Sequence, residues 1–216
     1  DSLAFERILS ASGPSAGDVR RPSDGKVPEN VVFIQCSGSR DPEKHKPYCS
    51  RICCMYTAKQ AMLYQHAVHG GQAHVFYIDI RSGGKNYEEF VERAQSEGVI
   101  YTRGKVSKIY RNGDKIAIMG VDTLAGRPVR MDADMVVLAM AMEPKASSEV
   151  LRGVLKISTD QNGFWMEAHP KMNPVGTTTE GVFLAGCGQA PRDIPDTVAQ
   201  ASGAAAKVMS QIGRAS

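Results

Sequence analysis

The feature that most constrains the fold is an alternation of short apolar runs with longer helical patterns. A β-branched run at Val31–Gln35 precedes a helical pattern over Tyr48–His69, and a run at Ala73–Ile80 precedes another at Tyr87–Ser96. A third run occupies Val99–Thr102. Strands that alternate with helices in this way pair in parallel, because each helix returns the chain to the same edge of the sheet. The pattern therefore predicts an α/β fold with a doubly wound, Rossmann-like sheet.

Three further strand-like segments follow this alternation. They are Val106–Tyr110, Ile116–Val121 and Val129–Met131, and the turns between them contain Gly113 and Gly126. Turns this short join neighbouring antiparallel strands. The sequence thus predicts a β-meander inserted into the α/β unit.

The composition is that of an ordinary globular protein. The chain has 216 residues, of which 42% are hydrophobic and 23% charged, enough for one large domain or two small ones. Its net charge of +3 is dispersed, so we expect no nucleic-acid partner. The longest apolar run, Met135–Met142, is shorter than the roughly 18–20 residues of a membrane span and fits a buried strand. We expect no direct membrane span.

Three regions differ in character. Residues 1–30 are rich in Gly, Pro, Ser and Asp after a short helical start, and we interpret them as a connecting segment. Residues 31–143 carry the α/β pattern. Residues 144–216 begin with a loop-rich stretch and contain a predicted strand at Gly181–Ala185 and a small-residue helix from about Pro195 to Ile212.

Cysteine usage indicates the cellular compartment. The chain contains five cysteines and starts at Asp1 without a secretory signal. We therefore expect a piece of a longer cytoplasmic protein, whose cysteines serve thiolate or metal chemistry instead of a disulfide framework.

Four of the cysteines lie where a dinucleotide-binding unit has its phosphate-binding turn. That turn is normally Gly-rich, because the backbone must approach a pyrophosphate closely. Here the first strand leads into Cys36, and the next predicted helix begins with Cys49, Cys53 and Cys54. A nicotinamide cofactor is therefore not expected at this position.

The predicted geometry suits a metal cluster. On a helix that starts at Tyr48, Cys49 and Cys53 share one face, and Cys54 lies about 100° further round. Cys36, at the strand end, can close over the same helix N-terminus, which stabilises thiolates. Four thiolates match the ligands of a [4Fe–4S] cluster. Spacing alone leaves three other interpretations open: packing thiols, a structural zinc ion and a redox dithiol.

Seven segments carry a specific resemblance to a known family. They are Gln35–Asp41, Pro47–Tyr56, Tyr77–Arg81, Leu9–Pro14, Arg21–Lys26, His169–Lys171 and Asp193–Ala201. Together they resemble the A subunit of heterodisulfide reductase, and the related flavin subunits of the quinone-interacting membrane-bound oxidoreductase complex. The resemblance extends over nearly the whole chain.

The resemblance implies a thioredoxin-reductase-like flavin subunit. In it, a [4Fe–4S] cluster occupies the degenerate NAD(P)-type lobe, here residues 31–143, and residues 144–216 form the C-terminal part of an FAD-binding lobe. The implied cluster ligands are Cys36, Cys49, Cys53 and Cys54.

The resemblance also implies FAD. Thr178–Gly186 is similar to the C-terminal flavin motif of disulfide-reductase-like flavoproteins, although Cys187 stands where many of them have an Asp. The implied FAD contacts are Gly186, Cys187, Ile194, Asp196, Thr197 and Val198. No Gly-x-Gly-x-x-Gly motif is present, so we expect only part of the FAD site here, and poor FAD binding.

These observations predict an oxidoreductase, although they assign no catalytic residue. The chain would be the electron-transfer module of a heterodisulfide-reductase-type subunit, passing electrons between FAD and a [4Fe–4S] cluster and on to partner subunits. Its expected partners are other subunits of a heterodisulfide-reductase-type or quinone-linked complex, through which it would associate with a membrane, and the missing N-terminal half of its own chain. The isolated fragment is expected to be inactive. Two alternatives are a non-catalytic zinc-binding scaffold and a dithiol disulfide reductase, although the usual Cys-x-x-Cys pair is lacking.

Overall fold

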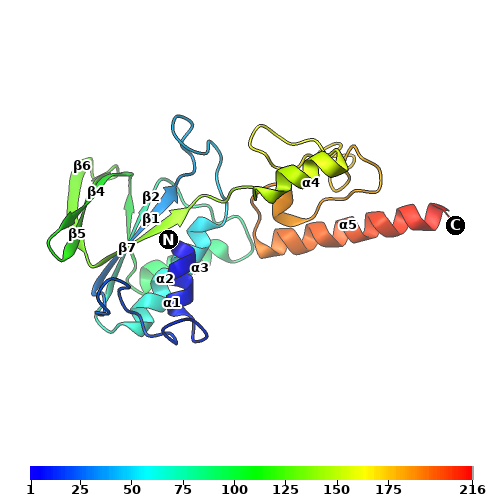
Figure 1. The fold of residues 1–216 in the computed structure, drawn as a ribbon. Coiled ribbons are helices and arrows are strands. Elements are labelled where there is room, and N and C mark those ends of the chain that lie inside the picture. Colours follow the sequence, from blue (N-terminus) through cyan, green and yellow to red (C-terminus); the bar gives the residue numbers. More distant parts are fainter. Residues whose placement is uncertain (216) are drawn as a thin grey trace. The chain divides into compact units, whose positions relative to one another are not determined.

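The computed structural model describes residues 1–215, with side chains through Gly213. The chain divides into two compact units (Figure 1). The first unit comprises Asp1–His45 and Cys53–Ala141, and the second comprises Lys46–Ile52 and Met142–Ser216. The short segment that holds Cys49 therefore groups with the second unit, although it lies within the region predicted as the first lobe.

A four-stranded parallel sheet forms the centre of the first unit. Its strands are β1 (Asn30–Ser37), β2 (Gln72–Tyr77), β3 (Ile100–Arg103) and β7 (Met135–Met140), and their order is β3-β2-β1-β7. All neighbours pair in parallel. The chain runs from β1 outward to β3 and then returns to the opposite side of β1, so the strand order reverses between β1 and β7. This is the Rossmann-like arrangement that the sequence predicts, and its reversal point is where such sheets bind ligands.

Three helices cover one face of this sheet (Figure 1). They are α1 (Ser2–Leu9), α2 (Cys53–Ala67) and α3 (Tyr87–Ser96). Phe33 and neighbouring apolar residues of the strands pack against them, and the Phe5 ring of α1 meets the Phe33 ring edge to face at 5.4 Å. The short helix expected at the start of the chain is confirmed, and the segment predicted to be a connector also supplies buried side chains to this core.

The antiparallel meander covers the other face. It consists of β4 (Val106–Asn112), β5 (Lys115–Asp122) and β6 (Arg127–Ala133). Val32 of β1 packs with Ile118 of β5 in a second small core. Because successive strand residues point to opposite faces, β1 contributes alternate residues to the two cores. The predicted meander is confirmed, with longer strands than the apolar pattern indicated.

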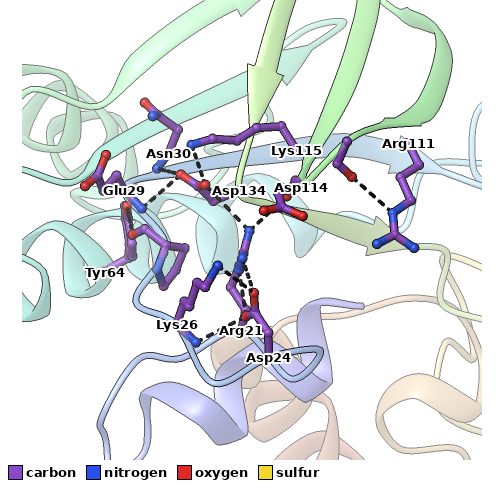
Figure 2. A network of polar contacts seen from close by, with 12 residues as sticks. Arg21, Asp24, Lys26, Glu29, Asn30, Tyr64, Arg111, Asp114, Lys115 and Asp134 are labelled. Atoms are coloured by element: carbon purple, nitrogen blue, oxygen red, sulfur yellow. Dashed lines mark hydrogen bonds and ion pairs between the residues drawn. The ribbon is translucent and has the colours of Figure 1, made fainter.

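A polar network at the start of β1 holds several segments of the first unit together (Figure 2). The Asp134 carboxylate accepts the backbone N–H groups of Glu29 and Asn30 at 3.1 and 2.9 Å. It also forms ion pairs with Lys115 of β5 at 2.5 Å and with Arg21 at 3.7 Å. One carboxylate between β6 and β7 thereby fixes the entry into β1.

The second unit has less regular structure. It contains α4 (Ser147–Leu155), a short 3-10 turn at Gly186–Gly188 and α5 (Ile194–Ala215). The predicted C-terminal helix is confirmed, whereas α4 lies in a stretch expected to be loop. The predicted strand at Gly181–Ala185 is wrong: one isolated bridge, between Gly176 and Phe183, is found there. A ladder needs a neighbouring strand along its length, and the described part of this unit supplies none.

No helix within residues 1–215 combines the length and the apolar character that crossing a membrane requires.

Candidate metal centre

Cys36 lies at the end of β1 in a strained conformation. Its φ is 58°, and the pairing of β1 with β7 shifts between Ile34 and Ser37. A left-handed conformation costs a non-glycine residue roughly 1–2 kcal/mol, and an irregular register of this kind redirects a side chain. Strain of this kind is typical of sites where a side chain must be held in one direction.

Cys53 and Cys54 are the first two residues of α2. Both are buried, with exposed fractions of 1% and 5%. The backbone N–H groups at the start of a helix and the helix dipole stabilise negative charge there. Two of the predicted ligands are therefore at a place that favours thiolates.

The predicted start of this helix at Tyr48 is wrong. The helix begins at Cys53, because Arg51 has a φ of 62°, which an α-helix does not admit. Cys49 and Cys53 therefore do not share a helix face. Cys49 lies in the preceding loop, where its sulfur accepts the Arg51 N–H at 3.3 Å. Four residues of chain limit the distance between the Cα atoms of Cys49 and Cys53 to about 14 Å.

The surroundings of Cys54 are polar although they are buried. Its sulfur lies 3.1 Å from Oε1 of Gln35 and 3.8 Å from the carbonyl oxygen of Asp79. Gln35 belongs to the end of β1 and Asp79 follows β2, so two neighbouring parallel strands direct polar groups at one thiol.

Asp79 also connects this region to two arginines. Its carboxylate accepts hydrogen bonds from Arg40 at 2.6 Å and Arg81 at 3.1 Å. Burial by itself raises the pKa of Asp79, but the hydrogen bonds from the two guanidinium groups outweigh it and hold that pKa below its usual value. The carboxylate therefore stays ionised at neutral pH and holds both positive charges near the end of β2.

Two buried tyrosines are affected by the charges of cysteines. Burial raises the pKa of Tyr56, and Cys53, Cys54 and Cys36 raise it further through their charges. Burial, together with the charges of Cys54 and Tyr77, raises the pKa of Tyr101 to about 12. Both phenols are therefore neutral near the thiols at physiological pH.

Several buried hydrogen-bonding atoms in this region have no partner among the described residues. They are Nε2 of Gln35, Oγ of Ser39, Oγ1 of Thr57 and Oη of Tyr101. Each of these groups can donate a hydrogen bond, and a buried donor without an acceptor is costly. Sulfur atoms of a bound cluster are acceptors, so this donor set and the four thiols fit such a group chemically.

A cavity of about 350 Å³ adjoins the end of β1. Cys36 and Gln35 line it, together with Lys105 and Lys108 beyond β3. It lies at the carboxyl end of the sheet, where Rossmann-like folds bind their ligands, and the two lysines favour an anionic occupant.

The zinc alternative is not favoured. Among residues 1–215, no three His, Cys, Asp or Glu side chains are grouped so that they could hold one metal ion. Four sulfurs around a single zinc ion would lie about 3.8 Å apart, because each Zn–S bond is about 2.3 Å in a tetrahedral site. In a cubane cluster each thiolate binds a different iron atom, so the four sulfurs lie further apart than they do around one zinc ion.

The residues expected to contact FAD gather partly around the start of α5 in the second unit. Gly186 has a φ of 73°, and a Cβ there would lie 2.9 Å from the Thr197 methyl carbon. The N–H of Asp196 bonds the Asp193 carboxylate at 2.8 Å, which caps the helix. Ile194 is exposed.

The other two expected contacts differ in their surroundings. Val198 is exposed on α5. Cys187 is also exposed, and its sulfur lies 3.6 Å from the Arg192 carbonyl oxygen.

Sequence reasoning missed the polar groups around Cys54. Gln35 was a detectable signal, because a glutamine that ends a run of apolar strand residues stands where an apolar side chain is expected. Asp79 and Tyr101 carried no such signal, since each comes near Cys54 only through the pairing of neighbouring strands.

The fold is similar to that of solved thioredoxin reductases. The structure from T. acidophilum matches with a TM-score of 0.54 at 17% identity, over 84% of this chain and 52% of that one. The Lactococcus lactis enzyme matches with a TM-score of 0.53 at 14% identity, over the same shares. At this level of identity the likeness shows the fold alone.

Curated relatives are much closer in sequence, although no family model matches the chain. An iron-sulfur A subunit of the CoB–CoM heterodisulfide reductase of Methanopyrus kandleri is 46% identical over 209 residues, which are 95% of this chain and 32% of that protein. The A subunit of the H(2):CoB-CoM heterodisulfide,ferredoxin reductase of Methanothermobacter thermautotrophicus is 48% identical over 207 residues, 95% of this chain and 31% of the relative. The chain thus spans about a third of the length of these relatives. With this identity across nearly all of its residues, the chain belongs to the family of heterodisulfide reductase A subunits.

Proposed function

We propose that this chain is an electron-transfer module of a flavin- and iron–sulfur-containing oxidoreductase. In this proposal Cys36, Cys49, Cys53 and Cys54 hold a [4Fe–4S] cluster. Electrons pass between that cluster and FAD, and onward to partner subunits. When bound, the cluster would supply one-electron transfer, and the protein would supply its ligands and surroundings.

One observation carries the proposal: three of the four cysteines lie at the two ends of the connection from β1 to α2, beside the point where the strand order of the sheet reverses. Cys36 ends β1, and Cys53 and Cys54 begin α2. Tyr56 follows them on α2, and the charges of all three cysteines raise its pKa. Gln35 and Thr57, near these cysteines in the chain, have buried donors with no partner within residues 1–215, and such donors suit a sulfur-rich anionic group.

The protein residues would position and balance this group. The N-terminus of α2 favours the negative charge of thiolates there. The ion pairs of Asp79 with Arg40 and Arg81 fix two cationic side chains close to the end of β2. Because Cys53 and Cys54 are buried, exclusion of water would strengthen the interaction of their thiolates with the helix N-terminus.

Partial FAD binding is the second part of the proposal. In the second unit, Gly186 leaves room for close approach of a cofactor, and α5 begins nearby with a capped N-terminus. Ile194 and Val198 expose 79% and 58% of their surface. Apolar residues this exposed at one helix start support the idea that further protein or cofactor covers them, which agrees with relatives about three times as long.

Anaerobic reconstitution tests the cluster. We expect about four iron and four sulfide per chain, with broad visible absorbance that dithionite bleaches. Cys53→Ser should lose most of the iron and sulfide while keeping the wild-type far-ultraviolet circular dichroism. Cys187→Ser is the matched control, because Cys187 is exposed and lies in the second unit, and it should keep the full complement.

Two outcomes would contradict the proposal. Colourless wild-type protein that retains one zinc ion and no sulfide would favour the alternative function, a non-catalytic zinc-binding scaffold. Equal loss of iron in Cys53→Ser and Cys187→Ser would show that the iron is not bound at the proposed cysteines.

A further inference from the structure

The side chain of Gln35 is the feature that goes beyond this assignment. It is 6% exposed, and its Oε1 lies 3.1 Å from the sulfur of Cys54. Its Nε2 has no partner among the described residues. A buried amide that uses its oxygen and leaves its N–H groups unpaired is in its less favourable orientation, because an unsatisfied donor is costly.

This orientation suits a thiol but not a thiolate. The thiol of Cys54 has one proton, which it can donate to Oε1 of Gln35. A thiolate has none, so the amide oxygen would then face a negatively charged sulfur. The carbonyl oxygen of Asp79, at 3.8 Å, is likewise an acceptor and offers the thiolate no hydrogen.

Rotation of the amide by half a turn removes both problems. The oxygen and nitrogen of an amide are nearly equal in size, so they exchange places without displacing neighbours. Nε2 then donates its hydrogen to the Cys54 sulfur. The oxygen then occupies the position in which the N–H groups had no partner. A buried carbonyl oxygen without a hydrogen-bond partner is less costly than a buried donor without one.

We propose that Gln35 donates an N–H hydrogen bond to the thiolate of Cys54 in the cluster-loaded protein and thereby raises the reduction potential of the cluster. This inference rests on the proposed function, because it requires Cys54 to be a cluster ligand. Adding an electron makes the sulfur ligands more negative, so a donor at one of them stabilises the reduced state more than the oxidised state. Gln35 is thus a positioning residue that acts through Cys54.

The test is a redox titration of the reconstituted full 216-residue chain, followed by electron paramagnetic resonance. Gln35→Leu keeps the approximate size of the side chain and removes the donor. We expect a more negative midpoint potential than in the wild type, by several times the scatter of replicate titrations, with unchanged iron and sulfide content.

Gln60→Leu is the matched control. Gln60 is also a buried glutamine of the first unit, but its amide donates to Ser2 and Glu6 and not to a cysteine. Its removal should leave the potential at the wild-type value. Equal shifts in both variants, or no shift in Gln35→Leu, would overturn the inference.

A measurement on the wild type covers the case in which Gln35→Leu does not assemble. With glutamine labelled by ¹⁵N in the side-chain amide, electron–nuclear double resonance of the reduced cluster should detect a coupled ¹⁵N nucleus. Absence of that coupling in a protein that holds its cluster would refute the role of Gln35 and leave the proposed function intact. Absence of iron and sulfide from the wild type would instead refute the proposed function.

Discussion

Replacing Asp134 by alanine tests how the first unit holds the start of β1. The side chain of Asp134 is 9% exposed and serves four groups (Figure 2). It accepts the N–H groups of Glu29 and Asn30, and it pairs with Lys115 and Arg21. Alanine removes every one of these contacts without introducing a bulkier group.

The expected loss follows from those contacts. The N–H of Asn30 is partly buried, and leaving it without an acceptor costs about 1–3 kcal/mol. The N–H of Glu29 is exposed and can turn to water, so it adds little. Lys115 is 42% exposed, and its ion pair therefore contributes at most about 1 kcal/mol. We expect a total loss of about 3 kcal/mol and a fall in Tm of about 6–12 °C.

Urea unfolding followed by far-ultraviolet circular dichroism measures this loss. Asp132→Ala is the matched control: Asp132 lies on β6 two residues before Asp134, and among the described residues its side chain accepts an exposed hydrogen bond from Asn112. The control should change the free energy of unfolding by no more than about 0.5 kcal/mol. If Asp134→Ala were as stable as Asp132→Ala, the reasoning about the network would be wrong.

Two further predictions concern acid and the second unit. Burial alone raises the pKa of Asp134, but Lys115 and the backbone N–H groups outweigh it and lower that pKa in the folded protein. The ionised carboxylate therefore stabilises the folded protein fully above about pH 4, and this stabilisation is lost as the pH falls through the pKa of the folded state. The stability gap between wild type and Asp134→Ala should therefore narrow in acid; a gap that widens would contradict this. In the second unit, Gly186→Ala should cost about 1–2 kcal/mol, because φ is 73° and Thr197 is 2.9 Å from the new Cβ. Gly203→Ala on α5 is the control: its new Cβ would lie 3.7 Å from Val175, and the substitution should raise the free energy of unfolding by about 0.5–1 kcal/mol. Trp165 fluorescence during urea unfolding measures both variants.

Local pattern was sufficient for most elements of the first unit. The periodicity of Tyr87–Ser96 predicted α3 with its observed bounds, and the β-branched run at Val31–Gln35 lies within β1. These segments could be predicted because their side chains repeat with the period of the element, and each element buries one face against a layer that the order of elements already implies.

Two errors mark where local pattern was insufficient. The helical spacing of Cys49 and Cys53 predicted one continuous helix, but the left-handed conformation of Arg51 ends that possibility. The apolar run at Gly181–Ala185 looked like a strand, yet in this unit it makes one isolated bridge. The backbone angle of Arg51 decides the first case, and the lack of a neighbouring strand within the described residues decides the second. Neither can be predicted from the residues next to it in the sequence.

The sequence by itself determined the order of strands and helices, the inserted meander and the set of cysteines that fits a cluster. The tertiary structure decided which buried polar groups surround those cysteines. Gln35, Asp79 and Tyr101 come from three different strands or their ends, and parallel pairing of β1, β2 and β3 brings them near Cys54. Periodicity reports which face a residue occupies, whereas the distance between residues far apart in the chain depends on how the strands pair.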